Sequence, residues 1–332
     1  MHEQAKLGDE FVERRTIAIG TCLPQERPEQ RAMSGLPERS AATRIGPRTF
    51  RWGARTFVMG ILNVTPDSFS GDGLLAARAG AGSALRAGEP AMVGALALAG
   101  AMAEGGADLL DIGGESTRPG HAAVDVADEI SRVVPVIEAV RGALPSMPIS
   151  VDTTKPAVAA AAIDAGADLI NDVWGVSDDD GMVRLAAERR VPIVLMHNRA
   201  EARYTNLMPE IVADLQRAIE RALRAGVAWD DILIDPGFGF GKTAEHNLVL
   251  LRELPILAIL GRPILLGTSR KSTLGRVLDL PADQRLEATI ATTALAIAAG
   301  VDVVRVHDVR ENVRAARMSD AVVRGTERED WA

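Results

Sequence analysis

The sequence predicts a (β/α)8 (TIM) barrel, because eight short apolar segments recur along the chain and each is followed by polar or glycine-rich residues and then an alanine-rich helical stretch. Continuous apolar segments are typical of parallel strands that are covered on both faces. A doubly wound sheet would give the same alternation, and the count of eight favours the barrel. The predicted strands are Phe57–Asn63, Asp108–Gly113, Pro148–Asp152, Asp168–Val173, Pro192–His197, Asp231–Asp235, Pro263–Thr268 and Asp302–His307.

The barrel is predicted to be a single domain with short additions at its ends. Residues 1–47 are rich in Glu, Arg, Pro and Ser without sustained periodicity, which predicts a weakly structured N-terminal extension. Residues 48–56 place a Trp-Gly turn between short alternating pieces, which predicts a small hairpin that caps the bottom of the barrel. We therefore assign residues 48–327 to the barrel and residues 328–332 to a C-terminal tail.

The segments between predicted strands carry recognisable helix ends. Three strands follow a Gly-Ala-Asp or Gly-Val-Asp sequence, at Gly106–Asp108, Gly166–Asp168 and Gly300–Asp302. Glycine commonly ends a helix, so we interpret each sequence as a helix end followed by the start of a strand. The long stretch Leu74–Gly94 is rich in Ala, Gly and Arg and predicts a mobile loop followed by the start of a helix.

Composition and charge exclude several classes of protein. The 332 residues carry a formal net charge of −8 and contain no run of Lys or Arg, which argues against a surface that binds nucleic acid. The single cysteine, Cys22, cannot form an internal disulfide, which is typical of a reducing compartment. The charged N-terminal residues lack the apolar core of a signal peptide and no apolar run is long enough to span a bilayer, so we expect a cytoplasmic protein without membrane or nucleic-acid partners.

Polar residues follow every predicted strand, and barrel enzymes build their active sites from these ends and the loops after them. The set is formed by Asn63, Gly113–Gly120, Asp152, Asn171-Asp172, Met196-His197, Asp235, Ser269–Ser272, and Arg305 with His307. Each of Asp152, Asn171 and Asp235 could instead cap the helix that follows it. Together they form a mouth of acceptors and amides that suits a flat heterocycle with several N–H donors, and we expect such a ligand or Lys271 to pair with the buried carboxylates.

The glycine-rich run Asp235–Thr243 (DPGFGFGKT) resembles a nucleotide-binding loop without being one. In the pattern G-x-x-x-x-G-K-[ST] the first glycine would fall on Pro236, and the spacing of the glycines also differs from G-x-G-x-x-G. A glycine-rich loop that presents Phe238 and Phe240 better suits a flexible wall with an aromatic face for a ligand. An ordinary surface loop is the alternative.

Cationic residues are predicted to gather at the same end of the barrel. Lys271 lies after strand seven, where barrels often bind anions, although a solvated surface lysine is the alternative. Arg305 and His307 are two residues apart on strand eight and therefore share one side of it. With Arg118 across the mouth they predict a pyrophosphate pocket, whereas His197 is predicted to be structural.

With these residues assembled, the chain resembles the dihydropteroate synthases, which join p-aminobenzoate to a pterin pyrophosphate in the folate pathway. The resemblance covers residues 56–324 and rests on seven matches in the same order. These are Met59–Ser70 (MGILNVTPDSFS), Asp111–Gly120 (DIGGESTRPG), Ser150–Pro156 (SVDTTKP), Asn171-Asp172, Asp235–Lys242 (DPGFGFGK), Ser269–Ser272 (SRKS) and Arg305–His307 (RVH).

The resemblance implies a role for each site residue. The pterin ring is expected to bind to Asp152, Asn171, Met196, Asp235, Lys271 and Arg305. The p-aminobenzoate is expected to bind to Thr117, Pro119, Phe240 and Ser272. Catalytic roles are implied for Asn63, Arg118, Lys271, Arg305 and His307, with Asn63 also the expected ligand of Mg²⁺. The family also implies a homodimer, and the Ala-rich stretch from Leu286 to Gly300 suits either a subunit interface or burial on the barrel.

The implied mechanism breaks the pterin CH2–O bond before the new bond forms. Pyrophosphate leaves, the cation delocalises into the ring, and the weakly nucleophilic amine of p-aminobenzoate attacks. No covalent enzyme nucleophile is needed, which agrees with the lack of a cysteine near the site and of a Ser-His-Asp arrangement. Charge stabilisation of the leaving group by Mg²⁺, Arg and His, and alignment of the two substrates, would provide the catalysis.

Two other functions remain open from the residues. A methyltetrahydrofolate-dependent corrinoid methyltransferase would keep the pterin-facing Asp and Asn but would not need Phe240 or Ser269–Ser272 as they stand here. A non-catalytic pterin-binding paralogue would bind the pterin without turnover. The order Ser70-Gly-Asp-Gly73 departs from the usual Ser-Asp-Gly-Gly of the family, and the first loop is longer than is typical.

Overall fold

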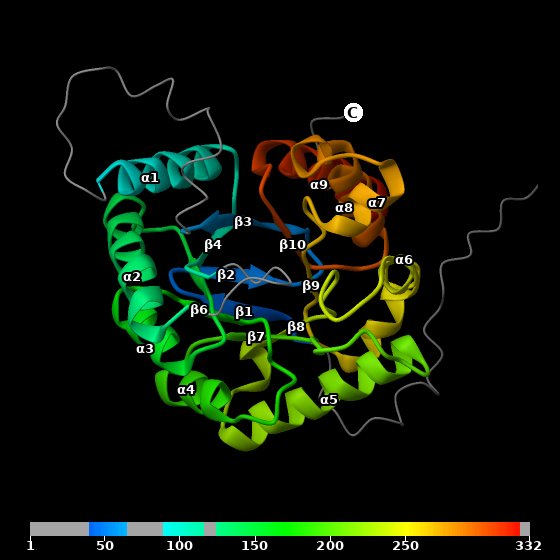
Figure 1. The fold of residues 1–332 in the computed structure, drawn as a ribbon, viewed down its shortest axis with the longest axis horizontal. Helices are drawn as coiled ribbons and strands as arrows, with labels where there is room; N and C mark the ends of the chain where they lie inside the picture. Colours follow the sequence, from blue (N-terminus) through cyan, green and yellow to red (C-terminus); the bar gives the residue numbers. More distant parts are fainter. Residues whose placement is uncertain (1–39, 65–88, 116–123, 326–332) are drawn as a thin grey trace, which may run out of the picture. The chain divides into compact units, whose positions relative to one another are not determined.

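The computed structural model describes residues 40–64, 89–115 and 124–325, and these form a parallel barrel enclosed by helices (Figure 1). Eight strands pair in the order β8-β7-β6-β5-β4-β3-β10-β9, and all these pairs are parallel. A bridge between Ile234 and Ile264 brings β8 next to β9, with the Ile234 amide 3.0 Å from the Pro263 carbonyl oxygen. The predicted (β/α)8 barrel is therefore confirmed.

The elements alternate along the chain as the sequence predicts. The strands are β1 Ala42–Ile45, β2 Arg48–Arg51, β3 Phe57–Asn63, β4 Leu109–Gly113, β5 Ile149–Asp152, β6 Leu169–Asp172, β7 Ile193–Met196, β8 Ile232–Asp235, β9 Leu265–Leu266 and β10 Val303–Val306. The α-helices are α1 Glu89–Glu104, α2 Val126–Ala143, α3 Pro156–Asp164, α4 Gly181–Arg189, α5 Leu207–Ala225, α6 Ala244–Glu253, α7 Ser272–Leu278, α8 Leu286–Ala298 and α9 Val309–Val323. Short 3-10 segments lie at Trp229–Asp231, Leu254–Leu260 and Ala282–Gln284.

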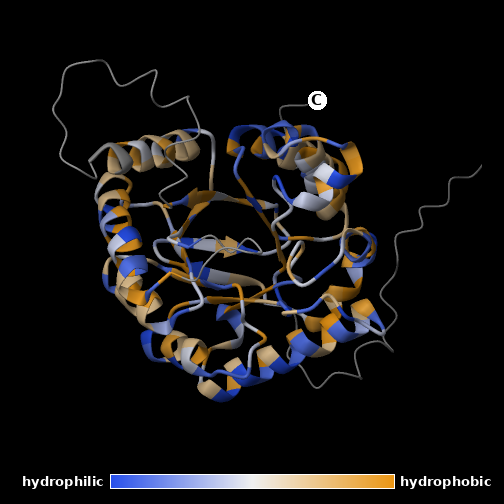
Figure 2. Cartoon of the chain, in the orientation of Figure 1, coloured by the Kyte–Doolittle hydropathy of each residue, from blue (hydrophilic) through white to orange (hydrophobic). Residues whose placement is uncertain are grey.

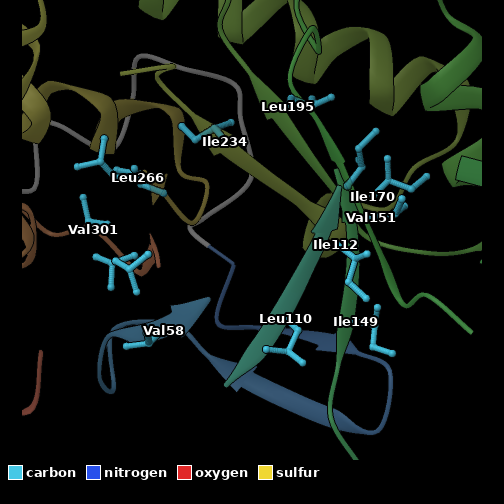
Figure 3. Close-up of a cluster of buried hydrophobic side chains, with 14 of the residues drawn as sticks. Val58, Leu110, Ile112, Ile149, Val151, Ile170, Leu195, Ile234, Leu266 and Val301 are labelled. Atoms are coloured by element: carbon cyan, nitrogen blue, oxygen red, sulfur yellow. The ribbon is translucent and has the colours of Figure 1, made fainter. Parts of the chain in front are cut away.

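The strands have two buried faces with different partners. Alternate residues point outward and pack under the helices, where they form one continuous apolar cluster (Figure 3). Val58, Leu110, Ile170 and Leu195 belong to this cluster. The residues at the remaining alternate positions of each strand point into the barrel. Every inward polar residue near a strand's carboxyl end therefore faces the same enclosed space. Because side chains alternate in direction along a strand, only every second residue of a strand can take part in a site inside the barrel.

A hairpin closes the amino-terminal end of the barrel. Its strands β1 and β2 pair in antiparallel fashion, and Phe50 and Trp52 join Phe57 in an aromatic cluster inside the barrel. The ring centroids of Phe50 and Phe57 are 4.7 Å apart. The predicted hairpin is present, but its first strand begins at Ala42, within the predicted extension, and its turn lies at Gly46-Pro47 rather than at Trp52-Gly53. Residues 1–39 lie outside the described residues.

The three Gly-Ala-Asp or Gly-Val-Asp sequences have the same structure in each case. Gly106, Gly166 and Gly300 have φ values of 97°, 112° and 89°, so each ends its helix in the left-handed conformation, as predicted. The aspartate two residues later accepts a backbone N–H from the neighbouring strand. In each case an Oδ2 atom of the aspartate lies 2.9 Å from the backbone nitrogen. The pairs are Asp108 with Val58, Asp168 with Ile149, and Asp302 with Ile264. We call these three contacts the aspartate clips.

The outer helices are amphipathic to different degrees. Helix α5 shows the clearest separation, with apolar residues toward the barrel and charged residues away from it (Figure 2). Of the helices that the structure describes, none combines the length and the hydropathy needed to cross a membrane.

Candidate active site

The candidate site lies inside the barrel at the carboxyl-terminal ends of the strands. Asp152 ends β5, Asn171 is the third residue of β6, and Asp235 ends β8. The register pairs Gly113 with Asp152 and Asp152 with Asn171, and it pairs Met196 with Asp235. These side chains are therefore brought together by strand pairing and not by the helices.

Arg305 of β10 connects the acidic side chains across the barrel. Its Nε lies 2.6 Å from Asp111 Oδ2, and its Nη2 lies 2.6 Å from Asp152 Oδ2. Asn171 donates to Asp111 Oδ2 from Nδ2 at 3.0 Å. Asp111 is fully buried and Asp152 is 6% exposed, so one guanidinium pairs with two carboxyl groups out of contact with bulk water.

The two carboxyl groups retain unused acceptor atoms. Among the described residues, Asp111 Oδ1 and Asp152 Oδ1 are buried and have no hydrogen-bond partner. Burial is the main cause that raises the pKa of Asp152 to about 7, against the opposing effect of Arg305. A ligand that donates N–H groups to this carboxylate would favour its ionised form and satisfy the free atom.

Asp235 and Lys271 form the second half of the site. Asp235 accepts the amide of Gly237 at 2.7 Å, and burial raises its pKa while the nearby Lys271 opposes the rise. Lys271 donates to the carbonyl oxygen of Phe238. Burial lowers the pKa of Lys271 to about 7, which leaves the ammonium easily converted to a neutral amine.

Both phenylalanine rings of the glycine-rich loop lie near Lys271, with centroids 5.9 Å (Phe238) and 4.3 Å (Phe240) from Nζ, but they differ in exposure. Phe238 is fully buried in the apolar cluster under the helices, so the expectation that it faces a ligand is wrong. Phe240 is half-buried, and its ring centroid lies 4.3 Å from Lys271 Nζ. Phe240 is therefore the ring available beside the charged cluster.

The partner of the buried Asp152 also differs from the expectation. The expected partner was a donor-rich ligand or Lys271. Among protein side chains the structure gives this role to Arg305 and not to Lys271, whose hydrogen bond goes to a backbone carbonyl, and the ligand remains a prediction. Arg305 is thereby committed to the acidic cluster through two of its nitrogens, Nε and Nη2.

The remaining predicted residues occupy the rim. His307 Nδ1 lies 3.0 Å from Ser269 Oγ, which links the ends of β10 and β9. Ser272 is exposed at the first residue of α7, Asn63 is half-buried at the end of β3, and Met196 is 2% exposed. Met196 lies next to the charged cluster through its register pair Asp235. Thr117, Arg118 and Pro119 lie outside the described residues.

The helix-capping alternative fails for the three acidic and amide residues. Helix α3 is capped at Lys155 and α6 at Thr243, so neither Asp152 nor Asp235 occupies an N-cap. Asn171 instead binds Asp111 within the barrel. The structural role predicted for His197 is confirmed, because its fully buried ring bonds to Asp214 and Lys242 outside the barrel.

Asp111 begins the motif Asp111–Gly120, and no role was predicted for it. The signal was available, since Asp111 is a charged residue inside an apolar strand, and it lies two positions before Gly113 on the inward face. Lys242, Asp214 and Arg199 were also missed, because their association depends on a contact between the loop after β8 and helix α5 that no local pattern reveals.

The described side chains offer few ligands for a divalent cation. Within residues 40–64, 89–115 and 124–325, no group of three or more His, Cys, Asp or Glu side chains could hold a metal ion. Mg²⁺ commonly binds through one or two protein oxygens together with substrate phosphates and water. An amide oxygen at Asn63 fits that pattern, and a metal cage built from protein alone does not.

Comparison with known proteins gives consistent matches over the whole barrel. Residues 59–307 match the family model described as pterin binding enzyme. The chain is 48% identical over 282 residues to the dihydropteroate synthase of Clostridium beijerinckii, which covers 85% of this chain and 99% of that relative. It is also 48% identical over 277 residues to the dihydropteroate synthase of Bacillus subtilis, which covers 83% and 92%.

Solved structures agree with the sequence matches. A dihydropteroate synthase from Clostridium difficile, in the presence of pteroic acid, superposes with a TM-score of 0.76 at 46% identity and covers 83% of this chain and 99% of that chain. The Xanthomonas albilineans dihydropteroate synthase with 4-aminobenzoic acid superposes with a TM-score of 0.76 at 42% identity and covers 85% and 98%.

Proposed function

Because this chain belongs to the pterin-binding enzymes, and within them to the dihydropteroate synthases, we propose that its barrel mouth joins 6-hydroxymethyl-7,8-dihydropterin pyrophosphate to p-aminobenzoate. The products are 7,8-dihydropteroate and pyrophosphate. The structure with 4-aminobenzoic acid and the one with pteroic acid support this choice of substrate and product.

The observation that carries the proposal is the pair of unused carboxyl oxygens on Asp111 and Asp152, next to Asn171 and Arg305. A pterin ring carries several N–H donors on one edge, and buried acceptors without partners are costly until such donors arrive. Asp152, Asn171 and Asp235 would bind that edge. Lys271 would bind an acceptor on the ring, and Met196 would form part of the wall.

The charge of the cluster suits the bond that breaks. Asp111, Asp152 and Asp235 carry three negative charges when ionised, against the two positive charges of Arg305 and Lys271. The net charge of −1 would stabilise the ring cation that forms when the CH2–O electron pair leaves with pyrophosphate. The amine lone pair of p-aminobenzoate then bonds to the methylene carbon, and the amine loses its proton.

The rim residues would serve the leaving group and the second substrate. His307 and Arg118 would bind the pyrophosphate oxygens, and Asn63 would hold Mg²⁺ with them. Bound Mg²⁺ supplies positive charge that stabilises the leaving oxygens. Phe240 and Ser272, with Thr117 and Pro119, would hold p-aminobenzoate, whose carboxylate suits the free N–H groups at the start of α7.

We further propose that the enzyme works as a cytoplasmic homodimer. Helices α8 and α9 pack together and expose large apolar side chains. Leu295 is 62% exposed, Met318 is 63% exposed and Val322 is 72% exposed. Burying such a patch against a second copy would remove apolar area from water. Sedimentation equilibrium of the purified chain tests this, and a monomer at micromolar concentration would contradict it.

Pyrophosphate release tests the proposed function directly. The purified protein is given the pterin pyrophosphate and Mg²⁺, with and without p-aminobenzoate, and both pyrophosphate and dihydropteroate are measured. We expect dihydropteroate to form in step with pyrophosphate. Binding of the pterin without any turnover would identify the chain as a non-catalytic pterin-binding protein instead.

A further inference from the structure

Lys242 ends the glycine-rich loop and has no role in the reaction as described above. Its ammonium Nζ donates to the carbonyl oxygens of Gly237 at 3.0 Å and Phe240 at 3.1 Å, and it lies 2.9 Å from His197 Nδ1. Burial lowers the pKa of Lys242 to about 7, and the protonated amine has three N–H donors, which these three acceptors would use in full. Lys242 therefore ties both ends of the loop to the end of β7.

His197 is held in one tautomer by its two neighbours. Its side chain is fully buried, and burial together with the nearby Lys242 lowers its pKa to about 3, so the ring is neutral. Because Nε2 faces the carboxylate of Asp214, which can only accept, the proton lies on Nε2, and Nδ1 accepts from Lys242. Nε2 is 3.1 Å from Asp214 Oδ2, which accepts this proton's hydrogen bond.

Asp214 fixes the far end of this chain of contacts. It lies on α5 and accepts from Arg199 Nη2 at 2.8 Å and Nε at 3.2 Å, and also from Arg217. Burial opposes ionisation of Asp214, but the hydrogen bonds from Arg199 hold the pKa of this carboxyl below its usual range. A carboxylate, a neutral imidazole and an ammonium thus form a line from α5 to the loop.

The loop needs such support because its backbone is unusual. Gly237, Gly239 and Gly241 have φ values of 70°, 84° and 53°. Glycine loses the most conformational freedom on ordering, so three left-handed glycines in five residues make the loop costly to hold in one conformation. A Cβ on Gly237 would lie 1.8 Å from the His197 carbonyl oxygen, so the loop packs directly on the segment after β7.

The opposite side of the same loop faces the site. Phe238 offers its carbonyl to Lys271, and a Cβ on Gly239 would lie 2.8 Å from Lys271 Cδ. The ring of Phe240 stands 4.3 Å from Lys271 Nζ. The loop is therefore a thin wall, with the Lys242 contacts on one side and the Phe240 ring on the other.

We propose that Lys242 is a positioning residue which, through the line Asp214–His197–Lys242, holds the Gly237–Gly241 loop so that the Phe240 ring lies where the aryl amine binds. The proposal rests on the proposed function for the identity of that substrate. It predicts a larger effect on the second substrate than on the pterin, because Asp152, Asn171 and Arg305 are joined to one another across the barrel, and only Asp235 and Lys271 of the pterin residues contact the loop.

The test compares Lys242→Met with the wild type in steady-state kinetics, pterin calorimetry and hydrogen exchange. We expect the KM for p-aminobenzoate to rise at least tenfold, while the Kd for the pterin pyrophosphate with Mg²⁺, measured without p-aminobenzoate, stays within threefold. Amide exchange of Gly239 and Phe240 should accelerate at least tenfold. Equal changes in KM and pterin Kd, or no change in either, would overturn the proposal.

A second pair of variants covers the case in which Lys242→Met does not fold. His197→Gln keeps an acceptor for Lys242 and a donor for Asp214, whereas His197→Leu keeps neither. A KM for p-aminobenzoate several times higher in the Leu variant than in the Gln variant supports the relay, and equal values contradict it. Arg203→Met, at a side chain 87% exposed in the same segment, is the control and should leave the KM within threefold.

The two proposals fail in different ways. Wild-type protein that releases no pyrophosphate would contradict the proposed function, and the hydrogen-exchange comparison would still decide whether Lys242 orders the loop. Normal wild-type turnover with an unaltered Lys242→Met variant would contradict only the positioning role.

Discussion

Arg305 forms an ion pair with Asp152 across the barrel, with 2.6 Å between Nη2 and Oδ2. The two residues lie on β10 and β5, which are separated in the sheet by β3 and β4, so the contact spans the interior and does not follow the strand pairing. Asp111 Oδ2 accepts a hydrogen bond from Nε of the same guanidinium. A site with these charges already fixed in place avoids the cost of arranging them when the substrate binds.

Lys271→Ala is expected to weaken binding of the pterin pyrophosphate about 10-fold to 100-fold, because a hydrogen bond from a charged donor contributes about 1.5–3 kcal/mol. Isothermal titration calorimetry of the ligand with Mg²⁺ measures the effect. Arg276→Ala, at an exposed side chain of the same helix α7, is the matched control and should bind normally. Near-normal binding by the Lys271 variant would remove this residue from the site.

The raised pKa of Asp152 predicts a pH dependence of stability in the ligand-free protein. In the folded state burial raises the pKa of this carboxyl group to about 7, whereas the pKa of a free aspartate side chain is 3.8. The stabilisation linked to the carboxyl proton is complete below pH 3.8 and is lost as the pH rises through about 7. Asp152→Asn cannot lose this proton.

We therefore expect the free energy of unfolding of the wild type to fall relative to that of Asp152→Asn by about 2.6 kcal/mol between pH 5 and pH 8. Urea unfolding of both proteins at four pH values in that range measures the difference. A difference that stays constant across the range would show that Asp152 does not titrate between pH 5 and pH 8 and would contradict the raised pKa.

Lys155 neutralises a carboxylate with no access to solvent. Its Nζ lies 2.6 Å from Glu129 Oε2, and it also pairs with Glu115. Glu129 is fully buried, so Lys155→Met should lower the free energy of unfolding by about 3 kcal/mol, because it leaves that charge without a partner. Adding Glu129→Gln should recover more than about 1 kcal/mol in a double-mutant cycle.

The exposed pair Arg184–Asp180 supplies the comparison for that experiment. Its side chains are 68% and 42% exposed, and Arg184→Met should change the free energy of unfolding by less than about 1 kcal/mol. Equal losses at Lys155 and Arg184 would contradict the explanation from burial.

Phe50→Ala separates stability from activity. Phe50 is 2% exposed in the aromatic cluster at the closed end of the barrel, so its loss should cost about 3–5 kcal/mol in thermal or denaturant unfolding. Turnover well below the melting temperature should stay within about twofold, since the charged cluster lies at the opposite ends of the strands. Loss of turnover in a fully folded variant would mean that the two ends are coupled.

The sequence predicted the strands well because each one is a short apolar run with both faces buried. All eight predicted runs contain the observed strands, although β9 is only Leu265–Leu266. The inward residues Asp152, Asn171 and Asp235 followed from the same pattern, since a polar residue at the end of such a run has few other reasons to be there.

Features that depend on contacts between distant segments were not predictable. The pairing of Arg305 with Asp111 and Asp152 joins segments 194 and 153 residues apart. The burial of Phe238 depends on which side of a glycine-rich loop packs against the helices, and glycine allows either. The hairpin began earlier than predicted because the Gly46-Pro47 turn, with Gly46 at φ 54°, was assigned to the extension.

The aspartate clips predict where the chain of this barrel can be cut into two fragments that still reassemble. Each clip joins two strands that are consecutive along the barrel chain, β3 with β4, β5 with β6, and β9 with β10. A chain cut at residues 144–148 would keep each aspartate on the same fragment as the amide that it binds. A chain cut at residues 105–107 would place Asp108 and Val58 on different fragments. The first pair of fragments should therefore reassemble more readily than the second, which makes the clips a map of the places where this barrel can be opened.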